Sequence, residues 1–241
     1  EVFHREAVLE MLASAGLDAS FLQNTPTLPG DEQVRADWLA AGHGPDALVQ
    51  NCSGKHAGML AACVAAGWST QTYLDAAHPL QVTIRQAVED LSGDAVEHVA
   101  VDGCGAPVMS LTLAGLARAF GRIAAAPEGP ERAVADAMRE NPQYVGGTHR
   151  EVTALMRALP GAVAKDGAEA VLALGLPDGR GLAVKVADGA ERALWPVAVE
   201  LLRAAGVENE ALGRVGAVQV MGHGRAVGSV VATGIVGEEA R

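Results

Sequence analysis

Lysine is scarce in this chain of 241 residues. Its 18 basic residues are fifteen arginines and only three lysines, Lys55, Lys165 and Lys185. Where a chain otherwise uses arginine, a lysine can mark a position that needs a compact ammonium group or an amine able to lose its proton. The three lysines are therefore the first positions at which we look for chemistry.

Basic runs and long apolar runs are also missing. The net charge is −11 and the pI is near 5.0. No Lys/Arg-rich run could follow a phosphate backbone, so we expect no nucleic-acid partner. No apolar stretch approaches the roughly 20 residues that cross a bilayer, so we expect no membrane partner. The start, Glu1-Val2-Phe3-His4, has neither a signal-peptide pattern nor an initiator Met.

Cysteine is sparse and odd in number, with thiols only at Cys52, Cys63 and Cys104. This usage favours a reducing compartment over a disulfide scaffold, and it predicts a cytoplasmic protein. The chain contains neither a CxxC nor an HExxH motif, so no common zinc motif is present.

The composition is that of a globular protein, with 49% apolar and 20% charged residues. The pattern predicts one domain over residues 1–241, mainly helical over 1–160 and rich in β-hairpins over 161–241. The predicted fold class is α+β, a mostly antiparallel sheet flanked by helices. Helices are expected at 4–16, 31–41, 53–66, 79–91, 112–125, 130–139, 148–158 and 190–205, a short strand at 97–101, and hairpins at 168–186 and 215–236.

Residues 51–60 place a thiol, an amine and an imidazole at the start of a helix that Ser53 can cap. Cys52 and Lys55 are three residues apart and share a helix face. Cys104 lies between two glycines, in a loop that follows the predicted strand, and two thiolates suit zinc. Judged by spacing alone, however, Cys52 and Cys104 are better interpreted as two unrelated cysteines of the core.

The remaining candidates have ordinary explanations when taken singly. Lys165 follows an apolar, strand-like run and would be a surface lysine at a strand end, and Lys185 would be solvated. Cys63 lies well inside a helix and is expected in the core. His56 and Asp102 could support neighbouring ligands, or they could be a helix-packing histidine and a turn-stabilising aspartate.

Several blocks in order resemble one family. They are Asn-Cys-Ser-Gly-Lys-His at 51–56, Tyr73 with His-Pro-Leu-Gln at 78–81, Asp-Gly-Cys-Gly-Ala-Pro at 102–107, Ala-Lys-Asp-Gly-Ala-Glu at 164–169 and Val-Lys-Val-Ala-Asp-Gly at 184–189. The chain resembles the bacterial type II L-asparaginases, the group similar to the inducible Rhizobium enzyme. The resemblance covers roughly residues 1–205 and is far more specific than one short motif.

The resemblance implies a fold of the serine β-lactamase/glutaminase type and hydrolysis of L-asparagine to L-aspartate and ammonia. It also implies a zinc site formed by Cys52, Lys55 and Cys104. His56, next to Lys55, and Asp102, two residues before Cys104, are then candidates for supporting or substrate-binding residues. Lys165 would belong to a Ser/Lys pair in which a neutral amine activates a serine. The family further implies a homodimer.

The sequence departs from the family at its nucleophile. None of its seven serines has a lysine three residues later, so we expect that the family's N-terminal part, with the Ser-x-x-Lys segment, is absent. A non-catalytic homologue that binds zinc or a small amino-acid ligand therefore stays open. So does a thiol hydrolase that uses Cys104 or Cys52 with His56. Asparagine and glutamine differ by one methylene, and both stay open as substrates.

Overall fold

The computed structural model describes residues 1–234, and it combines helices with antiparallel strands, which confirms the predicted α+β class. The chain forms two compact units. The first unit contains Glu1–Glu89 and Ala95–Ser110, and the second contains Asp90–Asp94 and the chain from Leu111 onward. The sequence predicts a single domain that is mainly helical up to residue 160, and this stays a prediction.

Helices dominate the first unit, and two short strands form its only regular sheet within the described residues. The helices are α1 (Val2–Ser14), α2 (Glu32–Ala40), α3 (Ser53–Ala66) and most of α4 (Pro79–Ser92), with a 3-10 turn at Ala19–Phe21. The strands β1 (Val99–Val101) and β2 (Pro107–Met109) pair antiparallel, with Val101 opposite Pro107. Each predicted long element is present here, within a few residues of its expected ends.

The caps of these helices follow from their sequences. The side chain of Asp31 accepts the N–H of Val34 at 2.9 Å, which confirms it as the N-cap of α2. Gly67 takes a left-handed conformation (φ 70°) and ends α3, as glycine does without steric cost. The N-cap of α3 is Cys52 rather than the predicted Ser53, which lies one residue inside the helix and is buried.

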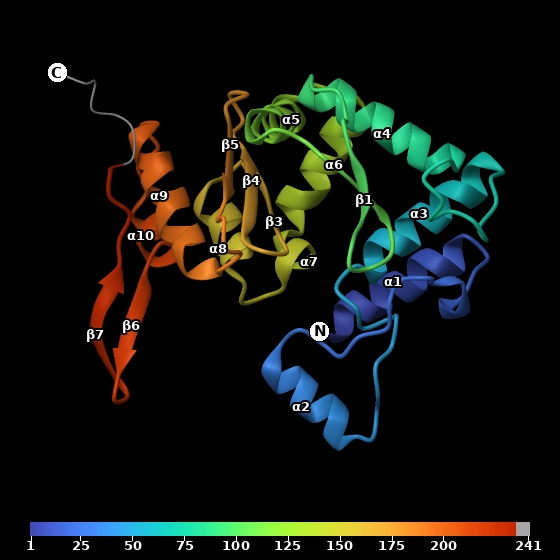
Figure 1. Ribbon diagram of the computed structural model, residues 1–241, viewed down its shortest axis with the longest axis horizontal. Coiled ribbons are helices and arrows are strands. Elements are labelled where there is room, and N and C mark those ends of the chain that lie inside the picture. The colour runs from blue at the N-terminus through green and yellow to red at the C-terminus, as the bar shows by residue number, and fades with distance from the viewer. Residues whose placement is uncertain (235–241) are drawn as a thin grey trace. The chain divides into compact units, whose positions relative to one another are not determined.

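Helix α1 packs along α3 and forms the core of the first unit (Figure 1). Leu12 of α1 and Leu60 of α3 are completely buried in this core. Gly54 of α3 faces Val8 of α1: a Cβ added at Gly54 would lie 3.9 Å from a methyl carbon of Val8, an ordinary van der Waals contact. Cys63 is buried in the same core, as its sequence position predicts.

The second unit alternates helices and hairpins. Its helices are α5 (Leu113–Ala125), α6 (Gly129–Glu140), α7 (Pro142–Gly146), α8 (Glu151–Ala158), α9 (Leu194–Ala204) and α10 (Glu210–Val215). Its strands are β3 (Val163–Gly167), β4 (Val171–Gly175), β5 (Gly181–Lys185), β6 (Val218–Gly222) and β7 (Arg225–Val230). The short helices α7 and α10 had no counterpart in the sequence prediction, and the hairpin β6–β7 turns at residues 222–224 as expected.

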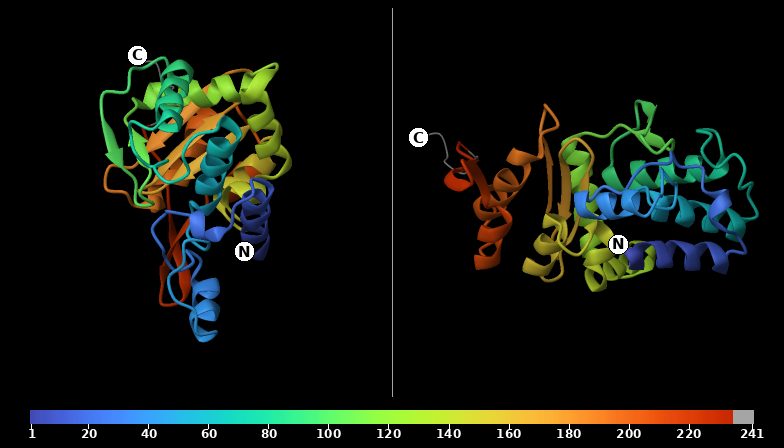
Figure 2. Two further views of the ribbon diagram at one scale, coloured as in Figure 1. Left: turned by 90° about the vertical axis from the view of Figure 1, so that its right-hand side faces the viewer. Right: turned by 90° about the horizontal axis from the view of Figure 1, so that it is seen from below.

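Strands β3, β4 and β5 form an antiparallel sheet in that order, and helices cover both of its faces (Figure 2). On one face, Leu172 and Leu174 are fully buried in a core shared with α8, α9 and α10. Residues two apart on a strand share a face, so Ala173 and Gly175 lie on the other face, toward α5. There, a Cβ added at Gly175 would lie 2.0 Å from the carbonyl oxygen of Phe120.

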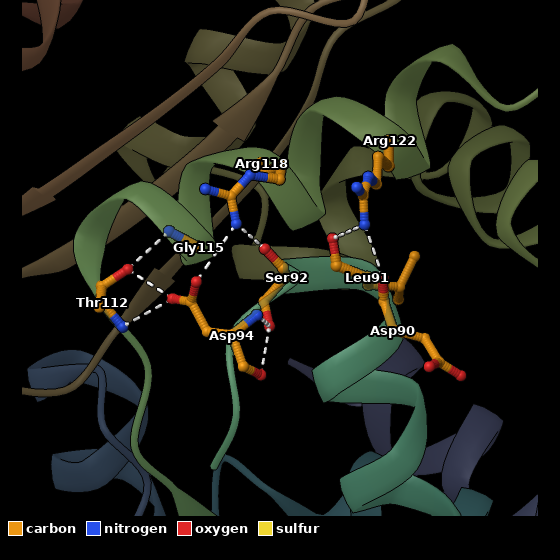
Figure 3. A network of polar contacts seen from close by, with 8 residues as sticks. All are labelled: Asp90, Leu91, Ser92, Asp94, Thr112, Gly115, Arg118 and Arg122. Carbon is orange, nitrogen blue, oxygen red and sulfur yellow. Dashed lines mark hydrogen bonds and ion pairs between the residues drawn. The ribbon is translucent and has the colours of Figure 1, made fainter. Parts of the chain in front are cut away.

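Two arginines of α5 bind the last carbonyls of α4, and all of these groups belong to the second unit (Figure 3). Arg122 Nη1 donates to the carbonyls of Asp90 at 2.6 Å and Leu91 at 2.9 Å. Arg118 donates to the carbonyl of Ser92. Carbonyls in the last turn of a helix have no partner within the helix, and cations there also interact favourably with its dipole. The two arginines therefore stabilise the end of α4.

The start of α5 is fixed from the same loop (Figure 3). Thr112 caps α5 by accepting the N–H of Gly115 at 2.9 Å. The carboxylate of Asp94 in turn accepts the hydroxyl of Thr112, and it lies 3.3 Å from Arg118 Nη1. The absence of a side chain at Gly115 leaves room for this carboxylate, since an added Cβ would lie 2.1 Å from a carboxylate oxygen of Asp94 and the aspartate would have to move.

Replacing Gly181 by Ala should destabilise the second unit. The added Cβ would lie 1.8 Å from the carbonyl oxygen of Ala117 in α5, so helix and sheet would have to move apart. We expect a loss of about 3 kcal/mol in the free energy of unfolding, the upper end of overpacking costs, measured by urea denaturation. Gly228→Ala in β7 is the matched control, because nothing lies within 4 Å of its added Cβ. Equal losses for the two variants would contradict this account.

Candidate functional site

Two segments of the first unit carry the predicted metal ligands. Cys52 caps α3 and Lys55 lies in its first turn, so both side chains leave the same end of one helix. Asp102 and Cys104 lie in the turn that joins β1 to β2. Backbone hydrogen bonds close this turn, from the N–H of Asp102 to the carbonyl of Ala106 and from the N–H of Gly105 to the carbonyl of Asp102, both at 2.8 Å.

The structure brings these four side chains together. Lys55 Nζ and Cys104 Sγ both bind the same oxygen of Asp102, at 3.0 Å and 3.2 Å. The donor atoms of Cys52, Asp102 and Cys104 all lie within 4.8 Å of one another. All three cysteines of the chain are free thiols in the structure. Residues separated by about half of the first unit therefore form one cluster, which we call the thiol–carboxylate cluster.

The charges in the thiol–carboxylate cluster act on one another. Burial lowers the pKa of Lys55, but its hydrogen bond to Asp102 and the nearby thiols raise it more, so the net shift is upward. Burial raises the pKa of Asp102, yet Lys55 and the Cys104 thiol lower it overall. Burial also raises the pKa of Cys52, and Lys55 only partly opposes this. A metal ion at this cluster would therefore have to displace protons from its ligands.

The raised pKa of Cys52 bears on the thiol-hydrolase alternative. A thiol nucleophile needs a lowered pKa, because the thiolate is the reactive form. The imidazole of His56 is hydrogen-bonded through Nδ1 to the hydroxyl of Tyr73, at 2.7 Å. Cys52 thus lacks the environment that activates a catalytic thiol.

The donor set of the thiol–carboxylate cluster fits zinc. Zinc binds thiolates, nitrogen donors and carboxylates, and sites with three protein ligands leave a position for water or substrate. Two thiols, an amine and a carboxylate converge here. Asp102, predicted only as a supporting or substrate-binding residue, is thus also a possible ligand. Its position two residues before Cys104 is a signal that could have indicated this.

His56 is completely buried in α3, beside Lys55. Burial lowers its pKa to about 4, and the charge of Lys55 contributes to the same shift, while Asp102 opposes it. Its ring therefore carries no charge at neutral pH. Tyr73, which sequence reasoning named only as one residue of the resemblance, is its direct partner.

Lys165 lies on β3 in the second unit, where Asp166 binds it. Its Nζ lies 2.9 Å from Asp166 Oδ1 and also donates to the carbonyl of Asp166. Arg150 Nη2 binds the other carboxylate oxygen of Asp166, at 2.6 Å. Lys165, Asp166 and Arg150 therefore form one group of ion pairs in the second unit. No spacing in the sequence indicated the pair between Arg150 and Asp166.

Lys185 has no comparable carboxylate partner among residues 1–234. Its amine donates to two backbone carbonyls, those of Glu169 at 2.5 Å and Val186 at 2.7 Å, and its side chain is exposed. The predicted solvated position agrees with this exposure. Lys185 therefore differs from Lys165 in its partners, although the two lysines lie in one sheet.

Stability should depend on pH through Asp166. Burial raises the pKa of this carboxyl group, but Lys165 and Arg150 together hold it below its ordinary value. A depressed folded-state pKa stabilises the protein above the ordinary aspartate pKa of about 3.9, and this stabilisation is lost as the pH falls further. The difference in unfolding free energy between wild type and Asp166→Asn should therefore be largest at neutral pH and shrink in acid. A difference independent of pH would contradict the ion pairs.

Comparison with known proteins gives one informative result. A search of curated proteins finds no significant match. No helix within the described part of the chain is long and apolar enough to cross a membrane. The sequence pattern of the L-asparaginase II family, in contrast, matches residues 1–232. Because this match extends over almost all of the 241 residues, the chain belongs to the L-asparaginase II family.

Proposed function

We propose that the protein hydrolyses L-asparagine to L-aspartate and ammonia and carries zinc at Cys52, Lys55 and Cys104. Family membership supports an amidohydrolase of the asparaginase type. Two observations support the finer proposal. Lys55 and Cys104 bind one oxygen of Asp102, and the ligand atoms of Cys52, Asp102 and Cys104 lie within 4.8 Å of one another. A cytoplasmic homodimer is part of the same proposal.

The thiol–carboxylate cluster would hold the metal through its two thiolates and the amine of Lys55. Bound zinc would supply a Lewis acid that polarises a carbonyl oxygen. Asp102 holds Lys55 and Cys104 in place through one oxygen, and its position suits either a direct ligand or a group that orients the ligands.

The proposed chemistry needs a nucleophile and a base. A serine hydroxyl would attack the side-chain amide carbon, Lys165 would take the hydroxyl proton, and that proton would leave with ammonia. Water would then break the acyl bond to release aspartate and restore the serine. None of the seven serines of this sequence has the Ser-x-x-Lys spacing, so the proposal assigns the nucleophile to none of them.

The absence of a Ser-x-x-Lys motif from this sequence favours a second candidate function. In this candidate, the protein binds zinc or a small amino-acid ligand without catalysing a reaction. It shares the thiol–carboxylate cluster with the first proposal and differs only in turnover. Hydrolysis assays on the complete natural gene product therefore separate the two.

The purified protein should contain about one zinc ion per chain. The Cys104→Ala variant should lose this zinc, because it would keep only two of the three proposed protein ligands. Cys63→Ala is the matched control, since Cys63 is buried in the core outside the cluster. Metal content is measured by elemental mass spectrometry, with circular dichroism to confirm folding. Full zinc content in Cys104→Ala would contradict the proposed site.

Lys165→Gln should lower asparagine hydrolysis by about 10²- to 10⁴-fold, the usual contribution of a positioned proton acceptor. Lys185→Gln is its matched control on the same sheet and should keep wild-type activity. Ammonia release is measured with asparagine and, in parallel, with glutamine, on the complete natural gene product. A wild-type protein that binds zinc but hydrolyses neither amide would support the non-catalytic candidate instead.

A further inference from the structure

The imidazole of His56 and the phenol of Tyr73 form a buried pair in the first unit. Neither side chain is exposed at all. His56 Nδ1 lies 2.7 Å from the Tyr73 hydroxyl oxygen, and the two rings meet edge to face at 5.6 Å between centroids.

Within residues 1–234, His56 Nδ1 is the one acceptor recorded for the proton of the Tyr73 hydroxyl. The oxygen accepts the backbone N–H of Gln23 at 3.1 Å, and a backbone N–H can only donate. The phenol proton is therefore left for an acceptor, and His56 Nδ1 lies within reach. An imidazole nitrogen that accepts a proton carries none itself, so the ring proton of His56 belongs on Nε2.

The surrounding residues hold Tyr73 in this position. Its carbonyl accepts the side-chain amide of Gln81 at 2.7 Å, and Gln81 is itself buried. The side-chain amide of Gln23 binds the carbonyls of Thr70 and Gln71, at 3.3 Å and 3.1 Å. The hydroxyl thus approaches His56 from a segment that is tied down on both sides.

The other ring nitrogen of His56 has no partner. Nε2 is buried and makes no hydrogen bond with any group in residues 1–234. Buried donors without a partner are rare in folded proteins, and one that persists calls for an explanation. A fixed, buried N–H is well suited to binding an oxygen atom of a small ligand.

The residue that carries this nitrogen is a sequence neighbour of the thiol–carboxylate cluster. His56 directly follows Lys55 on α3. The segment that binds Tyr73 through Gln23 continues to Thr25, whose N–H donates to the carbonyl of Cys104 at 3.3 Å. The histidine pair and the cluster are therefore joined by a short piece of backbone.

We propose that Tyr73 is a positioning residue that holds His56 with its proton on Nε2, so that His56 donates a hydrogen bond to an oxygen atom of the bound amide substrate. The donor role rests on the proposed amidohydrolase function, whereas the tautomer does not.

Nitrogen NMR of the ¹⁵N-labelled protein tests the tautomer directly, because two-bond ¹H–¹⁵N spectra distinguish a protonated ring nitrogen from an unprotonated one. His56→Gln identifies the signals by their disappearance. We expect the wild type to show Nε2 protonated and Nδ1 unprotonated. A proton on Nδ1, or rapid averaging between the two forms, would overturn the proposal whatever the variants do.

Tyr73→Phe tests the role of the hydroxyl, and Tyr144→Phe, at the only other tyrosine, is the matched control. Tyr73→Phe should move the His56 nitrogen signals toward a mixture of tautomers, and Tyr144→Phe should leave them unchanged. If the His56 signals are unchanged in folded Tyr73→Phe, the hydroxyl of Tyr73 does not determine the tautomer of His56.

Kinetics on the complete natural gene product test the donor. The side-chain amide of Gln can place an N–H near the position of Nε2, whereas Leu places none there. His56→Leu should lower kcat by about a hundredfold, and His56→Gln should recover much of this loss. Equal loss in both variants would overturn the donor role. If the wild type hydrolyses no amide while the NMR result holds, the proposed function fails and the tautomer stands.

Discussion

The carboxylate of Asp102 joins helix α3 to the β1–β2 turn. A single oxygen of this group accepts both the amine of Lys55 and the thiol of Cys104. Without it, two thiols and an ammonium group would meet in a half-buried place with no anion to balance the charge. This carboxylate therefore holds the donor atoms of the thiol–carboxylate cluster together, and its hydrogen bond to Lys55 raises the pKa of that amine.

Two glycines set how closely helix α5 approaches the sheet of the second unit. Helix α5 lies against the sheet at Gly175 and Gly181, where a single added carbon would collide with helix carbonyl oxygens. Glycine loses more conformational freedom on folding than other residues, so each such position costs stability that the resulting contact must offset. The distance between α5 and the sheet therefore depends on the absence of side chains at Gly175 and Gly181.

Sequence reasoning found the long helices and both C-terminal hairpins, because periodicity and caps such as Asp31 and Gly67 are local signals. It missed α7 and α10, which are too short to show a period and depend on packing for stability. It grouped Cys52, Lys55 and Cys104 only through family resemblance. The pairing of Asp102 with Lys55, 47 residues away, and of Arg150 with Asp166 depends on tertiary structure, which spacing does not encode.

The scarcity of lysine has a practical consequence for chemical labelling. Apart from the N-terminal amine, only three primary amines exist in this sequence, and two of them are paired with aspartates at proposed site positions. Lys55 and Lys165 are about half exposed, so a reagent can reach them. An amine-specific probe on this protein therefore reports mainly on residues of proposed function, with Lys185 as an internal reference, whereas on most proteins it reports on the general surface.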